Sequence, residues 1–355
     1  MRNWISAGLL AAIAACTPAA PPAPTAEDIA KTSAELTVWF DAEYDELLQM
    51  SPMQLTMLGR KDQYDKIDQF TDAASDAKLA WEKASVAEMR EKFDPAKLDA
   101  ESRTSFDMWA LQAEMDEKLA AFRRQGYVFV KDGPHASLAN FLITFHEVSE
   151  KSDIDAYIKR LSEVARALDQ SVEQAKLAAD AGVRPPRFAY DQASQEATNV
   201  ITGAPFGAGG DSPLWADVKA KIKALVDGGK LTADEAKATE ASAKTVLVET
   251  VKPSYDRIIG YLKEDRSKAS EKSQGVGSFA KGADFYNAML EVQTTTKMTA
   301  DEIHELGLKE VARLRSEMEA IREKVGFKGD LTAFLAFMRT DKQFYEPSTD
   351  AGRAA

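Results

Sequence analysis

Apolar residues recur at helical spacing along most of this chain. In residues 29–48, for example, Ile29, Leu36 and Phe40 fall on one face of a helix. Comparable patterns predict further helices at 72–93, 99–124, 136–148, 153–182, 189–202, 213–226, 232–264, 282–295, 300–325 and 330–339. Strand patterns are missing, apart from Tyr-Val-Phe-Val at 127–130, which favours a lone extended segment. The sequence therefore predicts an all-α protein, a multi-helix array of long antiparallel helices with little or no β structure.

Local signals predict where several of these helices begin. Thr25 is followed three residues later by Asp28, and Thr299 by Glu302, which is the spacing of a capping box. Ser51 precedes Pro52, a pair that suits the cap and the first turn of another helix. The Gly-rich stretch at 202–213 predicts an exposed, flexible loop.

The first residues carry a targeting signal. Arg2 precedes an uncharged, mostly apolar run that is too short for the ~20 residues of a membrane-spanning helix. The run ends in Ile-Ala-Ala followed by Cys16, the only cysteine of the chain. We expect a signal peptide at 1–15, a Pro/Ala-rich tether at 16–26 and a helical region at 27–355. The alternative is an ordinary signal peptide that happens to contain a cysteine.

The end of this signal resembles the bacterial lipoprotein signal, in which the cysteine is acylated and becomes the new N-terminus. The resemblance implies lipidation of Cys16 and a lipid-anchored protein of the bacterial cell envelope. Thr17 follows, rather than aspartate, which by the same resemblance favours the outer membrane, with the protein facing the periplasm. The net charge of −12 argues against nucleic acid as a partner and against electrostatic binding to anionic lipid. The expected membrane contact is therefore the bilayer, through acylated Cys16.

Candidate chemistry is sparse. A helical zinc peptidase would use H-E-x-x-H, but the chain has His146-Glu147-Val-Ser-Glu150, with glutamate in the place of the second histidine. His146 and Glu150 could supply two ligands, although a histidine flanking an apolar helix face is the simpler interpretation. His135 follows Gly-Pro and suits a loop or a first turn. With three scattered histidines, the sequence assembles neither a metal site nor a catalytic site, and no cofactor is expected in this chain.

Residues 282–311 predict a joint between two helices. Threonines at 294–296 disfavour continuation of the first helix, and the capping box at Thr299 begins the second. Gly307 lies inside the second helix, where a glycine usually permits close approach of a helix or a ligand. The second helix carries one apolar stripe at helical spacing, formed by Ile303, Leu306, Leu314, Met318, Ile321 and Val325. His304 lies at the edge of this stripe, and we expect it to be partly buried.

The segment from Gly-Ala-Asp-Phe-Tyr at 282–286 to Gln-Phe-Tyr at 343–345 resembles the central signature of the bacterial DUF 885 family. The aromatic pair, the threonine run and Thr-x-x-Glu-Ile-His-x-Leu-Gly-Leu carry the resemblance, which covers roughly residues 30–350. Where the family commonly has a tryptophan and a proline, this chain has Gly-Ser-Phe-Ala at 277–280, which leaves that loop open.

The resemblance implies a large, helical, often lipid-anchored protein similar to zinc metallopeptidases. The zinc motif of the family, H-E-x-x-H, lies in its C-terminal half, and no position of this chain matches it. Zinc is therefore expected only in a longer parent protein, and this chain would be an N-terminal portion, whether as a truncation, a fragment or a split half. Of the signature, we expect Tyr286, Thr295, Thr296 and His304 to line a substrate channel.

Two hypotheses remain open. In the first, the parent protein hydrolyses peptides in the cell envelope and this portion supplies the walls of the substrate channel. In the second, the chain is a non-catalytic helical binding or scaffolding lipoprotein. The absence of a metal motif favours the second for this chain alone, and the family resemblance favours the first for its parent.

Overall fold

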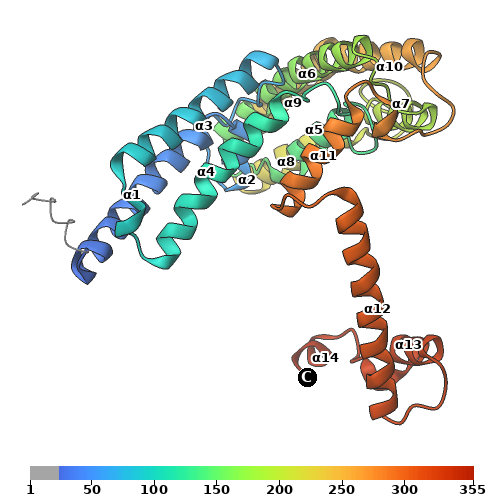
Figure 1. Ribbon diagram of the computed structural model, residues 1–355. Coiled ribbons are helices and arrows are strands. Elements are labelled where there is room, and N and C mark those ends of the chain that lie inside the picture. The colour runs from blue at the N-terminus through green and yellow to red at the C-terminus, as the bar shows by residue number, and fades with distance from the viewer. Residues whose placement is uncertain (1–23) are drawn as a thin grey trace, which may run out of the picture. The chain divides into compact units, whose positions relative to one another are not determined.

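The computed structural model describes residues 24–355, which are helical almost throughout (Figure 1). The α-helices are α1 (Ala26–Gln49), α2 (Pro52–Met57), α3 (Asp72–Lys92), α4 (Ala100–Ala120), α5 (Pro134–Phe145), α6 (Lys151–Asp180), α7 (Arg187–Val200), α8 (Pro213–Asp227), α9 (Ala233–Val246), α10 (Lys252–Arg266), α11 (Gly282–Thr294), α12 (Ala300–Lys324), α13 (Leu331–Thr340) and α14 (Asp350–Ala354). Short 3₁₀ turns are η1 (Pro95–Lys97), η3 (Val276–Ser278) and η4 (Lys342–Phe344). No strand occurs in this part of the chain, so the predicted all-α class is confirmed.

The chain divides into two compact units. The described part of the first unit comprises residues 24–117, 128–177 and 185–271, and the second comprises 118–127, 178–184 and 272–355. The expected signal peptide at 1–15, Cys16 and most of the tether at 16–26 lie outside the described residues. Within 24–355, no helix combines the length and the apolar character needed to cross a bilayer.

One core of the first unit lies among α1, α3 and α4. Trp39 of α1, Met89 of α3 and Phe106 of α4 are buried in it. The indole N–H of Trp39 donates to Glu88, and that of Trp81 donates to Glu46, which orders α1 and α3 as antiparallel neighbours. Apolar stripes on three helices thus share one interior, as their spacing predicts.

The larger core of the first unit collects side chains from α5 to α10. Tyr157 and Leu161 of α6, Leu214 of α8, Leu247 and Tyr255 are fully buried there. Helices α7 and α10 run antiparallel, because Asp191 pairs with Arg266 while Arg187 at the start of α7 donates to the carbonyl of Ala269 after α10. This core holds the polar cluster described below.

The capping predictions are confirmed. Thr25 and Thr299 each make both hydrogen bonds of a capping box, with Asp28 and Glu302 respectively. The hydroxyl of Ser51 accepts from the N–H of Gln54 at the start of α2. These contacts use only residues within one turn, so the local sequence is sufficient to specify them.

Two sequence predictions need correction. The helix expected at 232–264 is not one regular α-helix, because a π-helical turn, η2 (Leu247–Val251), separates α9 from α10, and the N–H of Lys252 bonds to the carbonyl of Leu247. Pro253 follows directly, and its missing N–H removes the regular hydrogen bond to the preceding turn. Within residues 127–130, where we expected an extended segment, positions 128–130 form bends and no strand pairing occurs.

The helices of the second unit include α11 to α14. Thr295 ends α11 in the left-handed conformation, with φ of 52°, which confirms that the threonine run ends the helix. Helix α13 packs against α12, and the ring of Phe327 contacts those of Phe334 and Phe337. None of the residues of α12 is buried.

Candidate functional site: a buried arginine–histidine cluster and two surface hollows

Arg160 is the central residue of a buried polar cluster in the first unit. It belongs to α6, and its side chain is fully buried. Its Nε donates to the carbonyl of Lys66 at 2.9 Å, and Nη2 donates to the hydroxyl of Thr56 at 2.6 Å. Its Nη1 lies 3.0 Å from Nδ1 of His146. No carboxylate in the described chain pairs with this guanidinium, so neutral acceptors and the ring of Tyr64, 4.8 Å away, stabilise the charge.

His146 is the second member of the cluster. Its Nε2 lies 3.0 Å from the carbonyl oxygen of Asp153, which can only accept, so Nε2 carries the proton and Nδ1 accepts from Arg160. The ring stacks on Tyr64 with centroids 4.0 Å apart and meets Tyr157 edge-on. Both ring nitrogens are therefore used in hydrogen bonds.

Burial sets the protonation of this cluster. It lowers the pKa of His146 to about 4, and the nearby charge of Arg160 acts in the same direction. Burial also lowers the pKa of Arg160 to about 10. For Asp153, burial raises the pKa, but hydrogen bonds from Lys61 and Ser149 outweigh it and bring the pKa below its usual value. At neutral pH the cluster thus holds a cationic arginine, a neutral histidine and a carboxylate paired with Lys61 at 2.7 Å.

The suggested pair of ligands at His146 and Glu150 is wrong in its geometry. His146 caps the end of α5 and Glu150 lies in the bend before α6, so the two residues do not share a helix. The lone pair of Nδ1, which a metal would need, already accepts from Arg160. The cluster holds α2, the end of α5 and α6 together, which is a structural role.

His135 lies in the first turn of α5, as its position after Gly-Pro predicts. Its Nε2 is 2.9 Å from Oε2 of Glu196 on α7, while its buried Nδ1 has no partner among the described residues. Burial lowers the pKa of His135, and Glu196 opposes the shift only partly. A histidine–glutamate pair can move a proton, but neither residue lines the groove or the hollow described below.

Groups of three or more His, Cys, Asp or Glu side chains placed to hold a metal ion are absent from residues 24–355. The histidines explain this absence. His135 and His146 are engaged inside the first unit, and His304 is exposed on α12 in the second, where we expected a partly buried side chain. The described residues therefore do not fit a zinc site.

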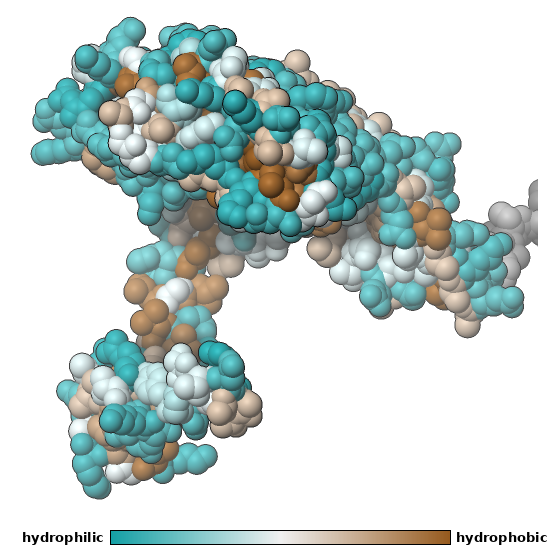
Figure 2. All heavy atoms as spheres, turned by 180° about the vertical axis from the view of Figure 1, so that it is seen from behind, coloured by the Kyte–Doolittle hydropathy of each residue, from teal (hydrophilic) through white to brown (hydrophobic). Residues whose placement is uncertain are grey.

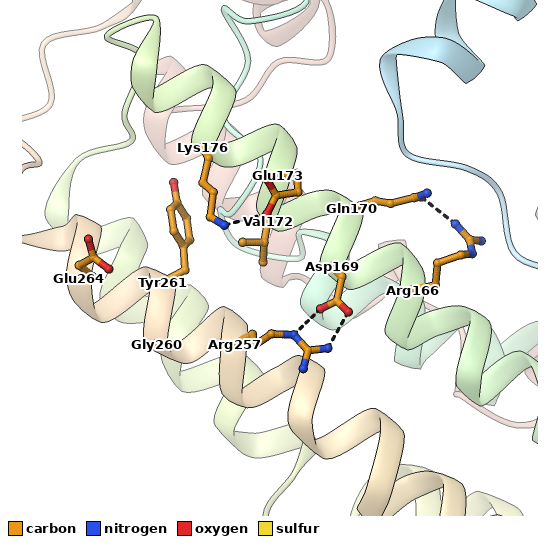
Figure 3. A pocket seen from close by; sticks show the side chains of 10 residues that line it. All are labelled: Arg166, Asp169, Gln170, Val172, Glu173, Lys176, Arg257, Gly260, Tyr261 and Glu264. Carbon is orange, nitrogen blue, oxygen red and sulfur yellow. Dashed lines mark hydrogen bonds and ion pairs between the residues drawn. The ribbon is translucent and has the colours of Figure 1, made fainter.

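A groove of about 660 Å³ lies between α6 and α10 in the first unit (Figure 3). Its walls carry charges of both signs, and these are paired. Arg257 of α10 donates to both carboxylate oxygens of Asp169 on α6, at 2.8 and 2.6 Å, and Lys176 pairs with Glu173 at 2.7 Å. Gly260 adds open space, because no atom beyond its chain neighbours and its own helix backbone lies within 4 Å of where its side chain would begin. The groove can hold a ligand, but it presents no pair of nucleophile and base.

The predicted substrate-lining residues are only partly brought together. Thr296 lines a hollow of about 470 Å³ at the joint between α11 and α12. Thr295 is adjacent in sequence, whereas Tyr286 and His304 are exposed and do not line that hollow. The proposed lining role of these four residues stays a prediction.

Sequence reasoning missed Arg160 and the groove. The position of Arg160 could have indicated its burial, because it lies three residues after Tyr157 and four before Val164, on the buried face of α6. The groove has no such signal, since it depends on how α6 and α10 approach each other.

Comparison with known proteins agrees with this architecture. A solved structure described as a putative lipoprotein from Colwellia psychrerythraea superposes with a TM-score of 0.69 at 16% sequence identity. The match covers 91% of this chain and 57% of that one, so the chain spans little more than half the length of this relative. A comparison with curated proteins finds no match. The sequence profile described as "Bacterial protein of unknown function (DUF885)" matches residues 52–355. The chain therefore belongs to the DUF885 family.

Proposed function

We propose that this chain is the N-terminal helical portion of a longer parent protein. The parent is a zinc metallopeptidase that is lipid-anchored in the bacterial cell envelope. In this proposal, Cys16 is acylated and holds the protein at the outer membrane, facing the periplasm. The chain itself supplies helical framework and channel walls for peptide substrates. The name of the longer relative and the short apolar run before Cys16 support the anchor.

The observation that carries the framework role is the hydrogen bonding of His146. Both nitrogens of this ring are used to join α5 to α6, so the histidine of the nearest H-E-x-x-H-like segment is structural. A catalytic zinc site usually needs three protein ligands and an open position for water. This chain alone is therefore expected to bind no stoichiometric zinc and to cleave no peptides.

Metal analysis tests this expectation. The chain is purified without a histidine tag, dialysed against trace zinc and measured by mass spectrometry, in parallel with His146→Gln and His304→Gln. Zinc near zero, with no cleavage of a mixed peptide library, supports the framework role. One zinc per chain that disappears in either variant would make this chain a candidate enzyme and contradict the proposal.

The anchor is tested separately by incorporation of a labelled fatty acid in a bacterial host. The unmodified chain is expected to take up label and to fractionate with membranes, whereas Cys16→Ala is expected to do neither. Equal, negligible labelling of both proteins would contradict acylation. The sequence encoded downstream of Ala355 tests the longer parent, because the proposal expects an H-E-x-x-H helix there, in the same frame or in a shifted one.

The second candidate function is a non-catalytic binding lipoprotein, and the groove between α6 and α10 favours it. Its walls combine the ring of Tyr261 with paired charges and open space over Gly260. A mixed library of short peptides, labelled and titrated against the chain, tests this function. Gly260→Leu is expected to fill the groove and abolish binding, while Gly207→Leu, at a loop glycine that also has open space around it, serves as the control.

A further inference from the structure

Helix α12 presents a continuous apolar face to solvent. Its members are Val311, Leu314, Met318, Ile321 and Val325, which we call the α12 stripe. Their exposed fractions lie between 37% for Met318 and 66% for Val311. Figure 2 shows hydrophobic residues gathered along the helix that Figure 1 labels α12. A row of large apolar side chains on a single helix is unusual at a free surface and is typical of an interface.

The spacing of the α12 stripe indicates the shape of its partner. Its members follow one another at intervals of three, four, three and four residues, which is the seam that one helix offers to another. Gly307 continues this face one turn earlier, and no atom beyond its chain neighbours and its own helix backbone lies within 4 Å of where its side chain would begin. A partner backbone can approach closely there. The face therefore suits an amphipathic helix with its own apolar seam.

Charged residues border the stripe on both sides, and several of them are paired within α12. Arg313 bonds to Glu310 at 2.7 Å and to Glu317 at 2.6 Å on one side, and Arg322 bonds to Glu319 at 2.8 Å on the other. The partner thus needs apolar contact along the seam. This composition, with an apolar centre and a polar border, is that of a protein interface.

Other segments of the second unit do not cover this face. Helix α13 packs against α12, and its Phe334 and Phe337 contact Phe327, which follows α12. The members of the stripe nevertheless remain exposed. The longer relative from Colwellia psychrerythraea offers an occupant, because a large part of its chain has no counterpart in this one.

We propose that the α12 stripe is the docking face for an amphipathic helix from the part of the longer family fold that this chain does not cover. The inference rests on the proposed function in one respect, namely that the chain is the N-terminal portion of a longer protein. The helix joins this portion to the remainder of the protein, either as one continuous polypeptide or as a separate one. The interface buries a seam about 20 Å long, since Val325 lies 14 residues after Val311 and each residue adds about 1.5 Å.

The test compares this chain with the full-length relative from Colwellia psychrerythraea. In this chain, one variant places glutamates at two stripe positions, Leu314 and Met318. A second variant places them at Ala312 and Ser316, on the opposite face of α12. In the relative, the residues that superpose on each pair are replaced in the same way. All four side chains are exposed in this chain. The paired substitutions add the same charge, so only burial by a partner distinguishes them.

In the relative, the stripe pair is expected to lower the melting temperature by about 5 °C or more, because two carboxylates would be buried in an apolar seam. The opposite-face pair is expected to have a much smaller effect. In this chain alone the two pairs are expected to behave alike, and the chain is expected to be monomeric. Equal effects of the two pairs in the relative would overturn the proposal.

Two further outcomes identify other occupants. A concentration-dependent dimer of this chain that Leu314→Glu/Met318→Glu dissociates would assign the stripe to a second copy. A selective loss of stability in the isolated chain would place the stripe against another part of the same chain. If the stripe variant of the relative does not fold, the contacts of the superposed side chains in its crystal structure decide instead. Fatty-acid labelling and zinc content do not depend on the stripe, so failure of the proposed function is distinguished from failure of this inference.

Discussion

Acidification should destabilise the first unit through His146. The imidazole is buried, and it faces the cation of Arg160, the ammonium of Lys221 and the carboxylate of Asp153. Its pKa is about 4 in the folded protein, against an ordinary value of 6.5. The unfolded chain therefore binds a proton at this residue more readily than the folded chain does, and stability is lost as the pH falls below 6.5.

The magnitude follows from these two values. At pH 8 the histidine is neutral in both states and contributes no pH dependence. At pH 5 it is mostly protonated in the unfolded chain and mostly neutral in the folded one, a difference of about 2 kcal/mol in the free energy of unfolding. The loss grows further towards pH 4, where the folded state begins to accept the proton. His135, whose pKa is also lowered, contributes a slope of the same sign.

Urea unfolding followed by helical circular dichroism at pH 8, 6 and 5 measures this effect. His146→Gln keeps a donor and an acceptor but cannot titrate, so the difference in free energy between wild type and variant should fall by about 2 kcal/mol from pH 8 to pH 5. His304→Gln, at an exposed position, controls for the loss of a histidine elsewhere. A difference between wild type and His146→Gln that stays constant over this range would refute the reasoning. So would an NMR titration that places the pKa of the folded His146 at 6 or above.

Substitutions at three other residues test individual contacts by chemical denaturation. Arg160→Met should cost less stability than Arg160→Lys, because methionine removes the buried charge, whereas the lysine ammonium stays buried with fewer acceptors in reach. The reverse order would contradict the conclusion that neutral acceptors stabilise the charge of Arg160. Asp153→Asn should cost about 2–3 kcal/mol, because the buried carboxylate accepts from Lys61 and from the backbone before α6; a loss below about 0.5 kcal/mol would exclude that role. Thr299→Ala should lower stability by about 1 kcal/mol through the cap of α12, whereas Thr299→Ser should be nearly neutral; equal losses would show that the hydroxyl is not the cap.

The sequence by itself determined the helices and most of their starting points. Apolar spacing specifies which face of a helix is buried, and a cap such as Thr25 or Thr299 depends on residues within one turn. The apolar pattern runs through Pro253 and predicted one helix there, and only the hydrogen bonding of the backbone decides that a π-helical turn precedes this proline.

Tertiary structure alone decided the chemistry of the buried sites. Arg160 is an ordinary cation in the sequence, and it becomes a buried one because Thr56, Lys66 and His146, distant along the chain, converge on it. The same convergence occupies both nitrogens of His146, which a motif search cannot reveal. The apolar face of α12 was predictable from the sequence, but its exposure was not. Helical periodicity indicates that a face is apolar, and only the packing of the other helices decides whether that face is covered.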